Sequence, residues 1–218
     1  MSLLNNMSLL LGFFIIYLVA SFNFAYLIAH IKKVDISTEG SGNPGSANVL
    51  RVLGKKAAFF VLLGDVLKGF MAPYILLIVF SSFDGLDQLY LITRAGFFAI
   101  LGHCFPIYYQ FKGGKGVASF IGLIIFLFSH LVPSGLSIYW FLFLGALYFI
   151  VFKASKISAL ASLSVVWGSS FIFYEPLSMD LPRDIMNPYF HFLIIIFLIT
   201  WKHKDNLNRI IKGDENKF

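Results

Sequence analysis

Three segments of the chain carry polar residues whose types and spacing suit the binding of phosphate. The first reads SGNPGSANVLR, at 41–51, between stretches of apolar residues. Its glycines allow tight backbone conformations with exposed N–H groups, its serine and asparagines add neutral donors, and its arginine offers a bidentate charged fork. A turn that enters a capped helix would contain the same residues, so this segment alone leaves both interpretations open. The candidate ligands are Ser41, Gly42, Asn43, Asn48 and Arg51.

The second segment reads GHCFPIYYQFKGGKGVAS, at 102–119, and its glycines enclose a lysine directly before the next predicted helix. Backbone amides, a helix N-terminus and an ammonium group can then converge on one anion. The spacing is not that of a Walker A loop, so ATP is not implied. The alternative is a flexible turn with lysines that orient the protein in the membrane. The candidate ligands are Lys112, Gly113, Gly114, Lys115 and Gly116.

The third segment is the C-terminal tail, which reads HKDNLNRIIKGDEN from residue 203. His203, Asn206 and Ile210 have the spacing of one helix face, which predicts a helix that continues from the last apolar run. Leu207 and Ile211 are expected to hold that helix against the bundle. An amphipathic interfacial helix anchored by lysines would explain the same pattern, with His203 only at headgroup depth.

Two ionisable residues lie inside an apolar run, in the sequence GDVLKG. Asp65 and Lys68 are three positions apart, so they can pair on one helix face, and charged groups at membrane depth usually face the bundle interior. We favour a buried structural ion pair over direct catalysis. The single cysteine, Cys104, excludes an intramolecular disulfide and a cysteine-based metal site, and we expect neither metal nor cofactor.

The composition indicates the elements that position these segments. Of 218 residues, 58% are hydrophobic and only 13% are charged, which is typical of an integral membrane protein. Apolar runs without alternation of apolar and polar residues predict helices and exclude a barrel. We therefore expect an all-α membrane protein with seven transmembrane helices in a single domain, 1–218. The runs are 9–31, 57–80, 91–109, 117–132, 136–152, 157–174 and 189–201.

The basic residues predict the orientation of these helices. Most of them fall in the first, third and fifth connections and in the tail, whereas the second and sixth connections hold mainly acidic residues. The positive-inside rule then places the N-terminus outside and the C-terminus in the cytoplasm. Such lysines and arginines suit anionic lipid, and no nucleic-acid-binding module is expected. The residues on the basic side are Lys32, Lys33, Arg51, Lys55, Lys56, Lys112, Lys115, Lys153, Lys156, Lys202, Lys204, Arg209, Lys212 and Lys217.

Taken together, the three segments and GDVLKG at 64–69 resemble the bacterial acyl-phosphate:glycerol-3-phosphate acyltransferases, the PlsY family. The resemblance covers essentially the whole chain, including its length and number of spans. Family members usually show His-Arg-Glu-Asn where this chain has His203 to Asn206, and often a threonine at Ser119. In the tail, the spacing from Gly213 favours Glu215 over Asp214 as the matching structural carboxylate.

The resemblance implies transfer of an acyl chain from acyl phosphate to the sn-1 hydroxyl of glycerol 3-phosphate, giving lysophosphatidic acid and phosphate. This would be the first step of phospholipid synthesis, in the bacterial inner membrane with the active site on the cytoplasmic face. An enzyme that produces acyl phosphate is an expected partner. Because acyl phosphate is a mixed anhydride with a good leaving group, positioning and charge stabilisation could supply most of the acceleration.

Each candidate residue then receives an expected role. Ser41 and Arg51 would hold a substrate phosphate, with Asn43 and Asn48 shaping or joining that contact, and the 113–116 loop with Lys115 would bind the other phosphate. His203 and Asn206 would orient the glycerol hydroxyl, and either His203 or a substrate phosphate oxygen would accept its proton. The remaining candidate is Ser158, a weaker phosphate ligand.

Two other classes of protein fit parts of the pattern. A transporter of organophosphates would explain the buried Asp65 and Lys68, but the sequence shows no internal repeat of the kind common in secondary transporters. A scaffold for lipid enzymes would not require such concentrations of glycine, lysine, serine and asparagine. We therefore favour the enzyme.

Overall fold

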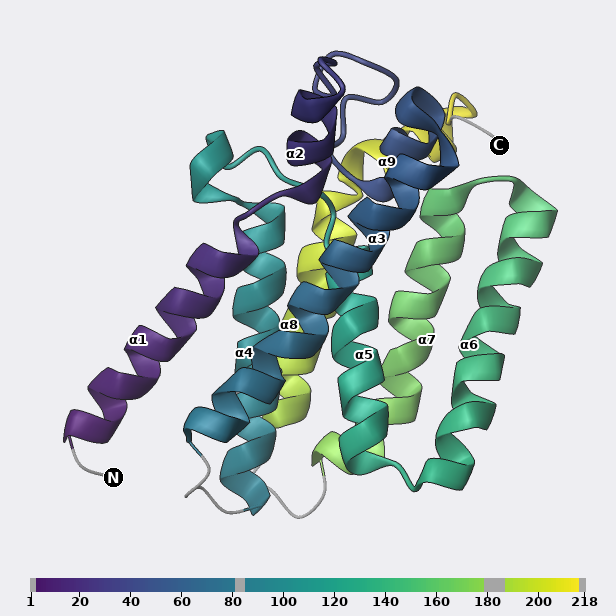
Figure 1. Ribbon diagram of the computed structural model, residues 1–218. Coiled ribbons are helices and arrows are strands. Elements are labelled where there is room, and N and C mark those ends of the chain that lie inside the picture. The colour runs from purple at the N-terminus through teal and green to yellow at the C-terminus, as the bar shows by residue number, and fades with distance from the viewer. Residues whose placement is uncertain (1–2, 81–84, 179–186, 216–218) are drawn as a thin grey trace. The chain divides into compact units, whose positions relative to one another are not determined.

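The computed structural model describes residues 3–80, 85–178 and 187–215, and within these ranges all regular structure is helical (Figure 1). In lipid, a helix satisfies every backbone hydrogen bond inside its own segment, so apolar runs of this length fold as helices. The prediction of an all-helical membrane protein is confirmed. The helices are α1 (Leu3–Ala20), α2 (Phe24–Ile31), α3 (Ser46–Val79), α4 (Gly85–Cys104), the 3₁₀ turn η1 (Ile107–Tyr109), α5 (Val117–Leu131), α6 (Ser134–Ser155), α7 (Ser158–Ser178), α8 (Pro188–Lys202) and α9 (Lys204–Lys212).

The helices pack into two compact units, Met1–Leu123 and Ile124–Phe218, with the boundary inside α5. In the first unit, α1 packs on α4 and α4 on α3, around a core that includes Phe13, Leu76 and Ala95. In the second unit, α7 packs between α6 and α8. Its core is aromatic, with the Phe173 ring 4.9 Å from that of Phe128 and 5.6 Å from that of Phe192.

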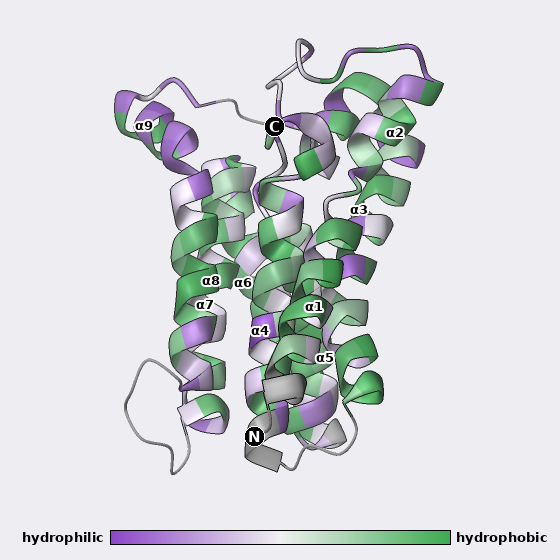
Figure 2. Ribbon diagram, turned by 90° about the vertical axis from the view of Figure 1, so that its left-hand side faces the viewer, coloured by the Kyte–Doolittle hydropathy of each residue, from purple (hydrophilic) through white to green (hydrophobic). Residues whose placement is uncertain are grey.

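Within the described residues, four segments are long and apolar enough to cross a membrane: Met7–Ile31, Ser46–Val79, Gln88–Tyr109 and Gly135–Ser155. The helices Val117–Leu131 and Pro188–Lys202 are apolar but shorter. Figure 2 shows mostly hydrophobic residues along α1 and α3, whereas α9 is largely hydrophilic. Seven spans, the orientation of the termini and a single domain over 1–218 stay predictions.

The first apolar run is two helices rather than the one that we expected. α1 ends at Ala20, and the Asn23 side chain caps α2 by accepting hydrogen bonds from the backbone N–H groups of Ala25 at 2.9 Å and Tyr26 at 3.2 Å. Asparagine competes for backbone donors in this way and favours helix starts over helix interiors. The break therefore sets α2 apart from α1.

The second run also differs from the prediction, because its helix begins at Ser46 instead of near residue 57. At 34 residues, α3 is about 50 Å long, well beyond the roughly 30 Å of a bilayer core. Its axis bends at Gly54, where φ is +83°, a left-handed conformation that favours glycine. Half of the expected polar loop, residues 46–51, is thus the first part of α3.

Glycines bring α3 and α5 into backbone contact. A Cβ atom added at Gly69 of α3 would clash with the Ser119 carbonyl, and one added at Gly122 of α5 would clash with the Val66 carbonyl. Only residues without a side chain allow two helix backbones to approach this closely. This contact fixes the start of α5, and with it the glycine loop, against the middle of α3.

We expect Gly122→Ala to destabilise the protein and the matched change Gly145→Ala to stabilise it. Both changes remove the backbone freedom of a helical glycine, which is worth about 1 kcal/mol. Gly145 has nothing within 4 Å of a new Cβ, whereas at Gly122 backbone must move, which typically costs about 1–3 kcal/mol. Thermal unfolding in detergent should show a lower midpoint for Gly122→Ala only. Equal midpoints for the two variants would contradict the helix contact.

Candidate functional site

The first polar segment is organised around the buried side chain of Asn48. Its Oδ1 atom accepts a hydrogen bond from the Ser41 backbone N–H at 2.7 Å, and its Nδ2 atom donates to the Glu39 carbonyl at 2.9 Å. With 1% of its surface exposed, Asn48 fastens the loop to the start of α3. Of the two roles that the sequence left open for Asn48, shaping the loop is the one that these contacts support.

The part of the loop before Asn48 has a defined conformation. At its start, the Asp35 carboxylate accepts hydrogen bonds from the Ser37 hydroxyl at 2.6 Å and the Ser37 amide at 2.9 Å, and these hold the pKa of Asp35 below its ordinary value. Further on, Gly42 has a φ of +68°, and a Cβ there would approach the Ser37 carbonyl at 2.8 Å. The glycine is therefore needed for the turn itself.

Ser41 and Arg51 lie on either side of the start of α3, and both are exposed. Ser41 belongs to the loop, whereas Arg51 belongs to the helix, two residues short of the bend that begins after Leu53. Asn43 and Gly42 are partly buried between them in sequence. The segment thus presents a serine hydroxyl, a helix N-terminus and a guanidinium group near one end of α3, which suits an anion.

The glycine loop at 113–116 runs directly into α5, which begins at Val117 as expected. Gly113, Gly114 and Gly116 are buried, Lys115 is partly buried and Lys112 is exposed. Gly116 has a φ of +87°, and its carbonyl accepts the first helical hydrogen bond, from Phe120 N–H at 2.8 Å. The Gly114 N–H donates to the His103 carbonyl at 3.2 Å, so this amide is already used inside the protein.

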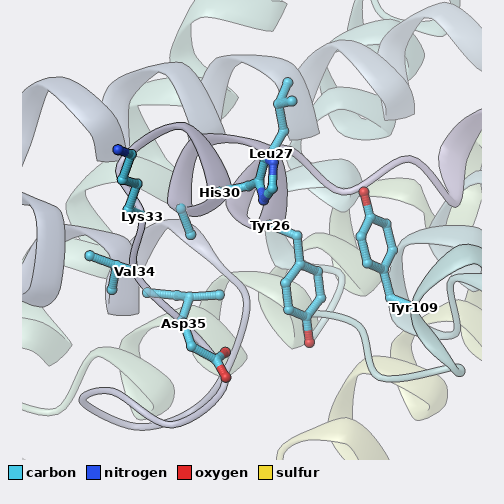
Figure 3. A pocket seen from close by; sticks show the side chains of 9 residues that line it. Tyr26, Leu27, His30, Lys33, Val34, Asp35 and Tyr109 are labelled. Carbon is cyan, nitrogen blue, oxygen red and sulfur yellow. The ribbon is translucent and has the colours of Figure 1, made fainter.

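Two tyrosines connect the glycine loop to α2. The Tyr26 ring stacks on that of Tyr109 at 4.5 Å between centroids, and the Tyr26 hydroxyl donates to the Lys112 carbonyl at 3.2 Å. Both rings are visible side by side in Figure 3. The α2 helix therefore supports the entrance to the glycine loop.

A pocket of about 580 Å³ opens beside this tyrosine pair (Figure 3). None of the predicted site residues lines it, and its walls are mainly apolar. The pocket is therefore separate from the residues that the sequence predicts to bind phosphate. Its lining residues are Tyr26, Leu27, Ala29, His30, Lys33, Val34, Asp35, Ile36 and Tyr109.

The expected ion pair in α3 is present and includes a third residue. Lys68 Nζ donates to Asp65 Oδ1 at 2.9 Å, and both side chains are nearly inaccessible, with 6% and 1% of their surfaces exposed. The His103 Nδ1 atom, at the end of α4, lies 3.3 Å from the same oxygen, a polar contact rather than a well-aligned hydrogen bond. The Lys68 ammonium also lies 5.2 Å from the centre of the Phe24 ring.

In the second unit, the tail breaks at His203 instead of continuing α8 as one helix. His203 ends α8 and begins α9, and its Nδ1 atom lies 2.8 Å from the Ile199 carbonyl oxygen. The side chains of His203 and Asn206 are both buried, with 3% and 6% of their surfaces exposed. Ile211, which we expected to pack against the bundle, is 83% exposed in the last turn of α9, whereas Leu207 one turn earlier is partly buried.

Glu215 holds the buried amide of the tail in place. Its carboxylate accepts hydrogen bonds from Asn206 Nδ2 at 2.7 Å and from Arg209 Nε at 2.8 Å. Asp214 is exposed, so Glu215 is the carboxylate that orders this segment. Elsewhere in the second unit, Ser158 begins α7, and its hydroxyl lies 3.4 Å from that of Tyr148.

His103 is the functional candidate that sequence reasoning missed. It stands within the second polar segment, but it lies ten positions before Gly113 and 38 positions after Asp65. Only the packing of α3 against α4 brings its ring between them. The one available signal was a histidine at the end of an apolar run, directly before the segment that carries the glycines.

Comparison with known proteins relates this arrangement to a family. The family model of glycerol-3-phosphate acyltransferases matches residues 10–213. The glycerol-3-phosphate acyltransferase of Coxiella burnetii (strain Dugway 5J108-111) is 38% identical over 213 residues, which cover 97% of this chain and 98% of the relative. That of Aquifex aeolicus (strain VF5) is 35% identical over 202 residues, covering 93% of this chain and 95% of the relative.

Solved structures agree with the sequence relatives. The crystal structure of PlsY (YgiH), an integral membrane glycerol 3-phosphate acyltransferase, in its glycerol 3-phosphate form has a TM-score of 0.78 and 32% identity to this chain. The match covers 97% of this chain and 96% of that one, and the lysophosphatidic acid form gives a TM-score of 0.75. By its sequence and by its fold, this chain belongs to the PlsY family of integral membrane glycerol-3-phosphate acyltransferases.

Proposed function

We propose that this acyltransferase takes its acyl group from acyl phosphate and transfers it to the sn-1 hydroxyl of glycerol 3-phosphate. The observation that carries the proposal is the buried glycine loop with Lys115 at the start of α5, in the same compact unit as the Ser41–Arg51 segment. A thioester donor would need only one phosphate site near the reacting groups. Two phosphate-binding segments suit a reaction in which both substrates present a phosphate.

The reaction needs no covalent enzyme intermediate. The glycerol hydroxyl oxygen attacks the acyl carbonyl carbon, a new ester bond forms, and the bond from that carbon to the phosphate oxygen breaks. The hydroxyl proton passes to His203 or to a phosphate oxygen, and inorganic phosphate leaves. Positive charge beside the leaving phosphate stabilises the transition state, a role suited to Lys115 with Lys112.

The remaining residues receive supporting roles. Ser41 and Arg51 bind the other phosphate, with Asn43 and Gly42 completing the loop and Asn48 holding its shape. In the tail, Asn206 is fixed by Glu215 and orients the hydroxyl. Ser158 is a further phosphate ligand at the start of α7.

The tautomer of His203 suits contact with a hydroxyl. A carbonyl oxygen only accepts hydrogen bonds, so the Nδ1 atom that lies 2.8 Å from the Ile199 carbonyl carries the hydrogen. The Nε2 atom of the neutral ring then has a lone pair. It can accept a hydrogen bond, or the proton itself, from the glycerol hydroxyl.

We also propose that the reaction takes place on the cytoplasmic face of the inner membrane. The basic residues of the first and third connections and of the tail support this placement, since positive charge gathers on the cytoplasmic side. An enzyme that makes acyl phosphate would then supply the donor from the same side.

The donor is tested by giving the purified protein in lipid vesicles labelled glycerol 3-phosphate with palmitoyl phosphate or palmitoyl-CoA. We expect lysophosphatidic acid with palmitoyl phosphate only, because the thioester lacks a phosphate adjacent to its carbonyl. Product from the thioester alone would show that acyl phosphate is not the donor, but the protein would still be an acyltransferase.

The same assay tests the sidedness of the reaction. Glycerol 3-phosphate is charged and does not cross the bilayer, so inverted inner-membrane vesicles should make product from added substrate and right-side-out vesicles should not. Activity confined to right-side-out vesicles would refute the cytoplasmic site. Vesicles lysed with detergent provide the control for total enzyme.

Arg51→Ala should raise the KM for glycerol 3-phosphate about tenfold or more, because a charge-assisted hydrogen bond contributes about 1.5–3 kcal/mol. Lys55→Ala is the matched control, as Lys55 is also exposed and basic but lies beyond the Gly54 bend. The KM values come from initial rates at saturating acyl phosphate. Equal KM values for the two variants would remove Arg51 from the site.

His203→Ala should lower kcat about 100-fold if its ring takes part in proton transfer, in line with general base catalysis. His203→Gln keeps a group that can accept a hydrogen bond near the Nε2 position but cannot take the proton. A turnover of His203→Gln close to that of the unchanged protein would assign the proton to a phosphate oxygen. Near-normal turnover of His203→Ala would exclude His203 from both roles.

A further inference from the structure

A buried polar cluster lies against the glycine loop, and the proposed reaction does not use it. The cluster consists of Asp65 and Lys68 of α3 and His103 of α4. We propose that His103, oriented by Asp65 and Lys68, is a positioning residue that holds the 113–116 loop in the conformation that binds a substrate phosphate. This inference rests on the proposed function for the assignment of that phosphate to the loop.

Two edges of the histidine ring contact two different parts of the protein. Its Nδ1 atom faces Asp65 Oδ1 at 3.3 Å. The opposite edge of the ring lies against Gly114, since a Cβ atom added there would clash with Nε2 and approach Cε1 at 2.9 Å. The ring therefore fills the space between a carboxylate of α3 and the backbone of the loop.

The backbone of His103 contacts the same loop. Its carbonyl accepts the hydrogen bond from Gly114 N–H at 3.2 Å, and a Cβ atom added at Gly113 would clash with that carbonyl. Two consecutive glycines thus lie directly on one residue, the first on its backbone and the second on its ring. Lys115 follows immediately, so the position of His103 sets where the ammonium group and the N-terminus of α5 stand.

Asp65 and Lys68, both in α3, fix the orientation of the ring. The carboxylate receives the Lys68 ammonium at 2.9 Å, and the lysine also lies over the Phe24 ring at 5.2 Å. An aspartate that is 1% exposed gains little net stability even when it is paired, so its presence here suits a purpose other than stability. Orientation of His103 supplies that reason, because the contact of Nδ1 with Asp65 leaves the opposite edge of the ring against Gly114.

His103 acts through the loop and not on the substrate. With 3% of its surface exposed and its outward edge covered by Gly114, the ring has no room to touch a reacting atom. Its substitution should therefore weaken binding of the substrate that the loop holds and leave the chemical step largely intact. This separates a positioning role from a catalytic one.

The test uses two substitutions that divide the functions of the ring. His103→Asn keeps a donor near the Nδ1 position but removes the edge under Gly114, whereas His103→Phe keeps a ring under Gly114 but removes the contact with Asp65. His30→Asn, at an exposed histidine of α2, is the matched control. Lys115→Ala serves as the reference that identifies which substrate the loop binds.

We expect His103→Asn to raise the KM of the same substrate that Lys115→Ala affects, by about tenfold, with kcat and the other KM within about threefold. His103→Phe should raise the same KM by a smaller factor and leave kcat and the other KM nearly unchanged, since its ring is in place but not oriented. His30→Asn should leave all three constants unchanged. Unaltered KM values in both His103 variants, or a loss confined to kcat, would overturn the proposal.

A double variant tests the contact with Gly114 directly. Gly114→Ala alone should impair the enzyme because the methyl group meets the histidine ring. Combined with His103→Asn, which vacates that space, it should cost no more than the worse single variant, because changes in contacting residues are not additive. A double variant whose loss equals the product of the two single losses would show that the ring and the loop are independent.

Hydrogen exchange of the 105–117 region separates this inference from the proposed function. The amide of Gly114 should exchange at least about tenfold faster in His103→Asn than in the unchanged protein, whether or not acyl phosphate is the donor. If the protein makes no product from acyl phosphate but the exchange difference is present, acyl phosphate is not the donor, whereas His103 still positions the loop. Equal exchange rates in a folded His103→Asn protein would overturn the positioning role itself.

Discussion

The need to satisfy backbone hydrogen bonds away from water governs this structure. Apolar runs meet this need by forming helices. Where a helix is interrupted, other groups must replace the backbone hydrogen bonds that are lost. Asn23 caps α2, Gly54 bends α3, Gly116 introduces α5 and His203 separates α8 from α9. Three of these four interruptions stand within a few residues of the polar segments, so the breaks in the helices are also the places where donors become available to a ligand.

Side chains that hydrogen-bond within the protein determine the shape of those places. The Asn48 amide hydrogen-bonds to the loop backbone, and the Glu215 carboxylate accepts hydrogen bonds from Asn206 and Arg209. In the proposed site, such contacts fix the binding groups before the substrate arrives, which lowers the entropy lost on binding and keeps the reacting groups aligned. For an acyltransferase whose substrate is already an activated anhydride in the proposed reaction, this alignment would be the main contribution of the protein.

Glycine serves two different purposes in the first unit. At Gly42 and Gly116 the backbone adopts positive φ values, so the residue is required by conformation. At Gly69, Gly113 and Gly122 the requirement is proximity, since a Cβ atom would strike the backbone of another segment. The second kind links the middle of α3 to the start of α5 and links the glycine loop to His103, so the buried ion pair and the glycine loop belong to one packed assembly.

The sequence alone determined the class of the protein and the residues of the polar segments. Hydrophobic runs can only be helices in lipid, and the spacing of Asp65 and Lys68 on one helix turn was sufficient to predict their pairing, because both signals are local. Tertiary structure decided which residues shape the site: Asn48 turned inward to the loop backbone, the tail broke at His203, and His103 came between Asp65 and Gly114. These three features depend on contacts between residues that are not neighbours in the chain. The close approach of two backbones selects the partners there, and the spacing of residues in the sequence does not reveal it.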